Sequence, residues 1–172
     1  NDVSPSIHDE PMLSDGTIHY LGQPIFLVVA RTHLQARFAA RQADIDYTKE
    51  TPILSIEDAL AADARFEDGP RIYTKGDVDA ALTSAPNRLT GRLEMGGQEH
   101  FYLEGQAALA LPQEGGDMVV QSSTQHPTEI QHKVAESLGV AMHAVRVEIR
   151  RMGGGFGGKE SQGNALAVSC AV

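Results

Sequence analysis

The sequence has a single cysteine, Cys170, and no run of basic residues. One thiol cannot form an internal disulfide, a multi-thiolate zinc site or a self-contained iron–sulfur cluster. Because no signal peptide is recognisable either, the sequence predicts a reducing, cytoplasmic compartment. A formal net charge of −9 makes nucleic acid and anionic membrane surfaces poor partners. The apolar stretches are also too short to span a bilayer.

The composition that is present is typical of a globular protein, with 41% hydrophobic and 22% charged residues in a chain of 172. This length suits one ordinary domain or two small ones. There is no initiator methionine, and the sequence stops inside an apolar run at 165–172. A helix this apolar needs cover on most sides. We therefore expect the chain to be an excerpt of a larger protein.

The first part of the sequence predicts alternating strands and helices. Residues 24–30 are a continuous apolar run, which favours a buried strand. Thr32 opens a capping-box pattern that predicts a helix to about Ala43. A short strand is expected at 45–47, and a second helix is expected from Ser55 to about residue 62.

A polar stretch at 63–70 ends in a Gly-Pro breaker and is the predicted domain boundary. Beyond it, Gly115-Gly116 marks a turn that pairs two strands in antiparallel fashion. Pro127 suits the first turn of a helix that Gly139 would end. The strands expected in this part lie at 88–95, 105–111, 118–124 and 145–149.

The densest signal is the glycine loop 152–160, which reads Met-Gly-Gly-Gly-Phe-Gly-Gly-Lys-Glu. Glycine in regular structure costs about 0.5–1 kcal/mol, so such a cluster is expected where the backbone adopts unusual dihedrals or approaches something closely. A ligand held by main-chain N–H groups is the simplest occupant. A flexible linker is a poor alternative, because such linkers do not usually surround a large aromatic residue and lead straight into an apolar helix.

Nucleotide-binding motifs match this loop only in part. The dinucleotide fingerprint needs a buried parallel strand before it and an acidic residue about 20 positions later, whereas the preceding strand here alternates with charges. The phosphate-binding loop needs Ser or Thr after Lys159, but the sequence has Glu160, which would repel phosphate. A nucleotide-binding module and an interaction domain therefore stay open as weaker alternatives.

Two further segments could contribute to a site. Residues 122–127 lie where a strand is expected to give way to a helix, and there Gln125 could donate an amide hydrogen to a bound oxygen. A simple capping turn is the competing interpretation. Residues 96–104 are a polar and aromatic cluster, best interpreted as a buried turn that positions neighbouring loops. The histidines of the sequence show no metal-ligand spacing.

In this order, the three segments resemble the molybdenum-binding part of the xanthine dehydrogenase family, with the bacterial-type subunit the better comparison. In that family they read close to Gly-Gly-Gln-Glu-His-Phe-Tyr-Leu-Glu, Ser-Thr-Gln and Gly-Gly-Gly-Phe-Gly-Gly-Lys-Glu. The resemblance implies a mixed α/β and α+β fold. Residues 1–65 would belong to an α/β-hammerhead domain, and 66–172 would begin the molybdopterin-binding domain.

The resemblance also implies an activity, the oxidation of hypoxanthine and xanthine to urate. In the family, an oxygen on molybdenum attacks the purine carbon and hydride passes to a sulfido ligand. The metal is held through a pterin dithiolene rather than by protein ligands. FAD and iron–sulfur clusters on other domains or subunits carry the electrons away. An aldehyde oxidase-type hydroxylase is the alternative within the same family.

Site residues follow from the resemblance position by position. Gln125 would lie near the oxo ligand of molybdenum, and Gly154 and Gly155 would lie beside the pterin. Phe156 and Gly157 would pack close to the metal. Glu160 would contact the purine and stabilise the charge that develops on it.

One position departs from the mammalian-type pattern. A lysine is expected four residues after the glutamine, but the sequence has Glu129. The catalytic glutamate and the substrate-anchoring arginine of the family have no match in the sequence. We therefore expect that the isolated chain neither holds molybdenum nor oxidises xanthine.

Overall fold

The computed structural model describes residues 1–66 and 69–172. By its internal contacts the chain divides into two compact units, one formed by 1–43 with 97–172 and the other by 44–96. The predicted boundary stretch at 63–70 includes residues 67 and 68, which lie outside the described residues. The division into domains at residue 65 stays a prediction.

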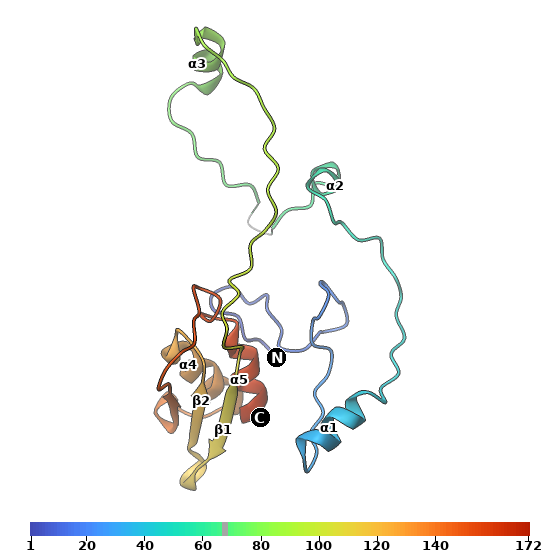
Figure 1. Cartoon of the computed structure of the whole chain (residues 1–172), viewed down its shortest axis with the longest axis vertical. Coiled ribbons are helices and arrows are strands. Elements are labelled where there is room, and N and C mark those ends of the chain that lie inside the picture. Colours follow the sequence, from blue (N-terminus) through green and yellow to red (C-terminus); the bar gives the residue numbers. More distant parts are fainter. Residues whose placement is uncertain (67–68) are drawn as a thin grey trace. The chain divides into compact units, whose positions relative to one another are not determined.

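The centre of the first unit is a small mixed sheet with the order β1-β2-β3 (Figure 1). Strands β1 (Ala108–Pro112) and β2 (Met118–Ser122) pair antiparallel, with Ala110 opposite Val120. The turn between them holds Gly115 at φ 74°, a left-handed conformation that favours glycine. The predicted hairpin is thus confirmed, with β1 starting later than expected.

Strand β3 (Val145–Glu148) lies parallel to β2, and the crossover between them contains α4 (Pro127–Leu138). Parallel neighbours need such a connection. Pro127 occupies the first turn of α4, and Gly139 ends the helix at φ 68°. Both predicted signals therefore act as expected.

Helices α4 and α5 (Gly163–Ala171) pack against each other, and between them they contact all three strands (Figure 1). Alternate residues of β2 point into this core, so that Met118 and Val120 are buried whereas Gln121 is exposed. Ile130 and Val134 of α4 are fully buried, as their spacing predicts. The core consists of Val3, Met118, Val120, Ile130, Val134, Ala135, Val145, Ala167 and Val168.

The short helices begin where their capping residues predict. Thr32 accepts a hydrogen bond from the N–H of Gln35 and precedes α1 (His33–Ala40). Ser55 caps α2 (Ile56–Ala61) in the same way. Helix α3 (Val78–Ser84), capped by Asp77, has no counterpart in the sequence-based expectation.

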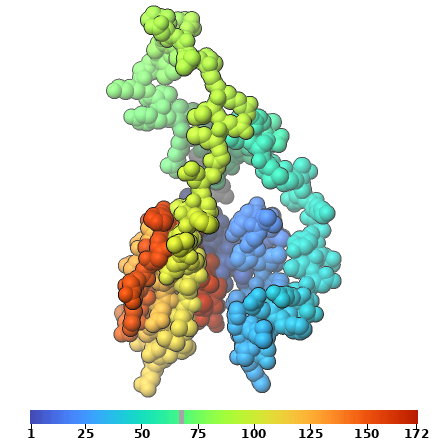
Figure 2. Space-filling view, viewed as in Figure 1, coloured from blue at the N-terminus to red at the C-terminus, as the bar shows by residue number. Residues whose placement is uncertain are grey.

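Several predicted strands are wrong. Residues 24–30, 45–47 and 88–95 have no ladder partner among the described residues. Their apolar side chains are largely open to solvent, with Val29 86% exposed and Leu89 fully exposed. A strand needs a neighbour to accept its hydrogen bonds, and an apolar run alone cannot supply one. Residues 44–66 and 69–96 contain no strand, and the space-filling view shows them as a thin run of atoms rather than a packed body (Figure 2).

Candidate functional site

The glycine loop and the segment around Gln125 lie in direct contact. The N–H of Gln125 donates to the carbonyl oxygen of Lys159 at 2.7 Å. The hydroxyl of Thr124 donates to the same oxygen at 3.1 Å. Two segments that are more than 30 residues apart in sequence therefore form one assembly at the end of β2, where the chain turns into α4.

The side chain of Gln125 is oriented by the loop itself. Its Oε1 accepts hydrogen bonds from the N–H groups of Gly157 at 2.9 Å and Lys159 at 3.2 Å. Because backbone N–H groups can only donate, the oxygen of this amide must face the loop. The NH2 group has no partner among the described residues, and Gln125 is solvent-exposed. It is therefore available to donate to a ligand.

Gly155 is required by this contact. A Cβ at this position would lie 2.5 Å from Oε1 and 2.9 Å from Cδ of Gln125. Any other residue would push the amide away from the loop. The sequence predicted that the glycines make room for a ligand, but at Gly155 the nearest neighbour is a side chain of the protein.

Phe156 and Gly157 form the tip of the loop, and both have left-handed backbone conformations, with φ of 52° and 93°. Such a conformation is uncommon for a bulky residue. Burial of the Phe156 ring does not offset the cost of this conformation, since the residue is 75% exposed. The loop therefore presents an aromatic ring at the surface, on the residue between the two glycines that contact Gln125.

Beneath the loop lies an ion pair that the sequence did not predict. The Nζ of Lys159 lies 2.8 Å from Oε2 of Glu104, and the lysine side chain is fully buried. The same ammonium group lies 4.9 Å from the centre of the Tyr102 ring. The hydrogen bond from Lys159 lowers the pKa of Glu104 below its usual value, and the hydrogen bond from the N–H of Gly153 adds a smaller effect in the same direction.

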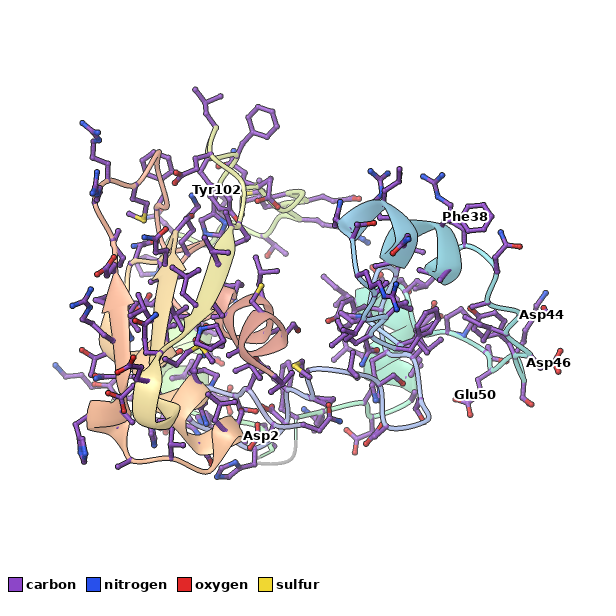
Figure 3. All side chains as sticks on the ribbon, turned by 90° about the horizontal axis from the view of Figure 1, so that it is seen from below. Asp2, Phe38, Asp44, Asp46, Glu50 and Tyr102 are labelled. Carbon is purple, nitrogen blue, oxygen red and sulfur yellow. The ribbon has the colours of Figure 1, made fainter. Side chains whose placement is uncertain are left out.

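The segment 96–104 therefore does position the loop, but it is not a buried turn. Phe101 and Leu103 are 82% and 94% exposed, whereas Tyr102 and Glu104 face the glycine loop. Tyr102, labelled in Figure 3, lies on the chain that leads into β1. The backbone of this segment bends, with Phe101 in the left-handed region at φ 49°, and it brings Tyr102 and Glu104 to the same loop. No local sequence pattern signals the pair of Glu104 and Lys159, because the two residues are 55 positions apart.

Two glutamates near the site have different surroundings. Glu160 is exposed, and its carboxylate has no hydrogen-bonding partner in the described part of the chain. Glu129 is engaged: its Oε1 accepts from Nδ2 of Asn164 at 2.6 Å, and its Oε2 lies 3.1 Å from Nδ1 of His126. The carboxylate at the position of the expected lysine thus connects α4 to α5.

Across residues 1–66 and 69–172, no group of three His, Cys, Asp or Glu side chains is arranged to bind a metal ion. None of the helices described here is long and apolar enough to cross a membrane.

Comparison with known proteins identifies the class of this fold. Residues 65–172 match the family model of the molybdopterin cofactor-binding domain. Residues 1–51 match the model of the aldehyde oxidase and xanthine dehydrogenase a/b hammerhead domain. The chain belongs to the molybdopterin cofactor-binding domain family, in the group that contains aldehyde oxidases and xanthine dehydrogenases. This family is enzymatic, and these named members are oxidoreductases.

Individual relatives agree with this assignment. Xanthine dehydrogenase of Drosophila subobscura is 39% identical over the whole chain, which corresponds to 13% of that protein. Probable aldehyde oxidase 1 of Oryza sativa subsp. japonica is 40% identical over 98% of the chain, again 13% of the relative. The chain thus spans about an eighth of the length of these relatives.

A solved structure supports the fold. The crystal structure of quinoline 2-oxidoreductase from Pseudomonas putida 86 superposes with a TM-score of 0.77 at 23% identity. The match covers 91% of this chain and 21% of that chain. The predicted fold class, a hammerhead portion followed by the start of a molybdopterin-binding domain, is therefore confirmed.

Proposed function

We propose that the chain forms part of the cofactor and substrate site of a molybdenum hydroxylase that oxidises hypoxanthine and xanthine to urate. The observation that carries this proposal is the contact between Gln125 and the glycine loop. It presents an exposed aromatic ring on a segment next to an amide donor and a carboxylate that have no partner among the described residues. The proposal specifies the substrate within a family that is established by the comparisons.

The residues of this site fit a molybdenum–pterin group. Gln125 has its carbonyl oxygen satisfied by the loop and keeps its NH2 group for an oxygen of the cofactor. Gly154 and Gly155 would place bare main chain beside the pterin, and Phe156 and Gly157 would pack near the metal. The group supplies the redox chemistry when bound, and protein ligands to the metal are not needed.

In this proposal Glu160 acts on the purine. Its carboxylate is exposed and follows directly on the loop that Gln125 holds. As the protonated acid, or through a shared proton, it would donate to a purine heteroatom and stabilise the charge that develops on the ring during oxidation. An aldehyde needs no such partner. Glu160 therefore favours a purine over an aldehyde, although the similarity to an aldehyde oxidase keeps that activity as the second candidate.

The phosphate-binding alternative is not supported by the loop geometry. A phosphate loop uses its lysine and its backbone N–H groups to hold the phosphates. Here the ammonium group of Lys159 is buried against Glu104, and the N–H groups of Gly157 and Lys159 donate to Gln125. These donors are thus occupied within the protein.

The full activity needs partners beyond this chain. We propose that the remainder of the molybdenum subunit supplies the catalytic glutamate and the substrate-anchoring arginine. FAD and iron–sulfur clusters, on other domains or on another subunit, would accept the electrons.

The substrate assignment is tested by replacing Glu160 in the full-length enzyme. Glu160→Ala should lower kcat/KM for xanthine by about 10²–10⁴, the range of a general acid–base contribution. Turnover of an aromatic aldehyde should change far less. The matched control is Glu94→Gln, which alters an exposed carboxylate remote in sequence from the loop. Equal loss on both substrates, or unchanged xanthine turnover, would refute purine recognition by Glu160.

A further inference from the structure

The ammonium group of Lys159 is fully buried, so it is the charge of the glycine loop that most needs a partner within the protein. Removing an ammonium ion from water is unfavourable unless a counter-charge and good geometry compensate for it. Lys159 has both, since Glu104 lies 2.8 Å away and the ring of Tyr102 offers its face at 4.9 Å. The loop residue that lies deepest is thus held by the segment before β1.

Glu104 holds the other end of the same loop. The oxygen that pairs with Lys159 also accepts a hydrogen bond from the N–H of Gly153 at 2.8 Å. The N–H of Glu104 in turn donates to the carbonyl oxygen of Gly153 at 3.3 Å. One carboxylate therefore ties the first glycine of the loop, Gly153, to Lys159 near its end and closes the base of the loop.

The main chain of Lys159 transmits this constraint to Gln125. Its N–H donates to Oε1 of Gln125, and its carbonyl oxygen accepts from the N–H of the same residue. The side chain of Lys159 is anchored on one side of the loop while its backbone contacts Gln125 on the other. Movement of the ammonium group would therefore move the partner that orients the amide.

We infer that Glu104 and Lys159, with Tyr102 over the ammonium group, form a clamp that sets the position of the glycine loop against Gln125. These are positioning residues, because they touch the loop rather than the substrate. The effect of the clamp on molybdenum binding in the enzyme rests on the proposed function. The structural part of the inference concerns only this chain.

The clamp is tested by amide hydrogen exchange of residues 153–160 in the full-length protein. Glu104→Gln removes the counter-charge but keeps the shape, so exchange of the loop amides should accelerate about tenfold or more, as expected for loss of a charged hydrogen bond. Glu99→Gln is the matched control, since its side chain is 75% exposed in the same segment. It should leave the loop unchanged.

A double variant separates a clamp from two independent contributions. Glu104→Gln alone leaves a buried charge without its partner, whereas Glu104→Gln with Lys159→Met removes both charges. Exchange in the double variant should therefore be slower than in Glu104→Gln. If the rate increases of Glu104→Gln and of Lys159→Met multiplied in the double variant, the inference would be overturned. It would also be overturned if the loop exchanged at the same rate in Glu104→Gln and in the unmodified protein.

The pH profile supplies a readout that packing alone would not change. Because the Lys159 ammonium group and the N–H of Gly153 lower the pKa of Glu104, the clamp should be intact above the ordinary carboxylate pKa and weaken as pH falls through the lowered value. The hydroxyl of Ser123 contributes in the same direction. Loop protection should fall in acid in the unmodified protein, and this dependence should vanish in Glu104→Gln.

Two further measurements keep this inference apart from the proposed function. If Glu104→Gln loosens the loop and the full-length protein binds molybdenum, metal content per chain should fall in the variant. If the loop loosens but the unmodified protein holds no molybdenum and does not oxidise xanthine, the proposed function fails and the clamp stands. If turnover is normal and loop exchange is unaffected, the clamp fails and the function stands.

Discussion

At the scale of single residues, the site depends on Gly155 because this residue allows Gln125 to reach the loop. We predict that Gly155→Ala displaces the Gln125 side chain, since the new Cβ would lie 2.5 Å from Oε1. The N–H groups of Gly157 and Lys159 would each lose an acceptor. Their exchange should accelerate by up to about tenfold, the effect of losing one hydrogen bond. Hydrogen exchange of the full-length protein measures this.

The control for this prediction is Gly97→Ala. Within the described structure a Cβ at Gly97 would meet nothing within 4 Å, and its φ is not in the left-handed range. It should therefore leave the loop amides unchanged. If Gly155→Ala exchanged like Gly97→Ala, the close contact with Gln125 would not be what requires glycine.

Residue-scale reasoning from the sequence grouped Gln125 with the glycine loop, and the position of Gly155 beside the pterin stays a prediction. It did not foresee that Gly155 also leaves room for the Gln125 side chain. It also missed the pair formed by Glu104 and Lys159, which are 55 residues apart. A capping residue acts on its own helix and leaves a local pattern, whereas a long-range ion pair leaves none.

At the scale of elements, the contrast between local and long-range interactions explains which predictions hold. The helices after Thr32, Ser55 and Pro127 are confirmed, because their start signals act within one turn. The strands expected at 24–30 and 88–95 are wrong, because a strand depends on a neighbour that the pattern does not specify. The hairpin of β1 and β2 was predictable since its turn is local.

Asn164 joins α5 to α4 and to the N-terminal segment, and it offers a test at this scale. Its Nδ2 donates to the carbonyl oxygen of Val3 at 3.1 Å and to Oε1 of Glu129 at 2.6 Å, and the residue is 1% exposed. Asn164→Ala would leave both acceptors without this donor, at a cost of about 1–3 kcal/mol. We expect the N-terminal segment to loosen, so that the N–H of Val3, which donates to the carbonyl oxygen of Glu10, exchanges faster, and we expect a lower stability of the packing between α4 and α5.

Two comparisons sharpen this test. Asn164→Asp should be at least as harmful, because it places a second carboxylate against Glu129. Asn87→Ala, at an exposed position, should have no effect on these amides. A stable Asn164→Ala variant with an unchanged Val3 amide would show that the N-terminal segment is held by other contacts.

At the scale of the whole molecule, the two units differ in what they bury. The first unit has a core in which Val120, Ile130 and Val134 are fully buried. In the second unit, none of the described residues is buried, and Leu54 and Leu89 are 86% and 100% exposed. In Figure 3 the side chains of Asp44, Asp46 and Glu50 point away from the ribbon. The described part of this unit therefore has no hydrophobic core to offset the entropy of ordering its chain.

The contrast between the units leads to a prediction for the chain on its own. Helices α2 and α3 contain 6 and 7 residues, and isolated helices of this length are marginal in water. In the isolated 172-residue chain their amides should exchange at nearly the rate of an unfolded peptide. In the full-length protein they should be protected, because large apolar patches of this kind are normally covered. The amides of β2 and α4 serve as the internal control, since their core should protect them in both forms. Equal protection of α2 and α3 in the two forms would mean that the second unit is ordered by its own contacts.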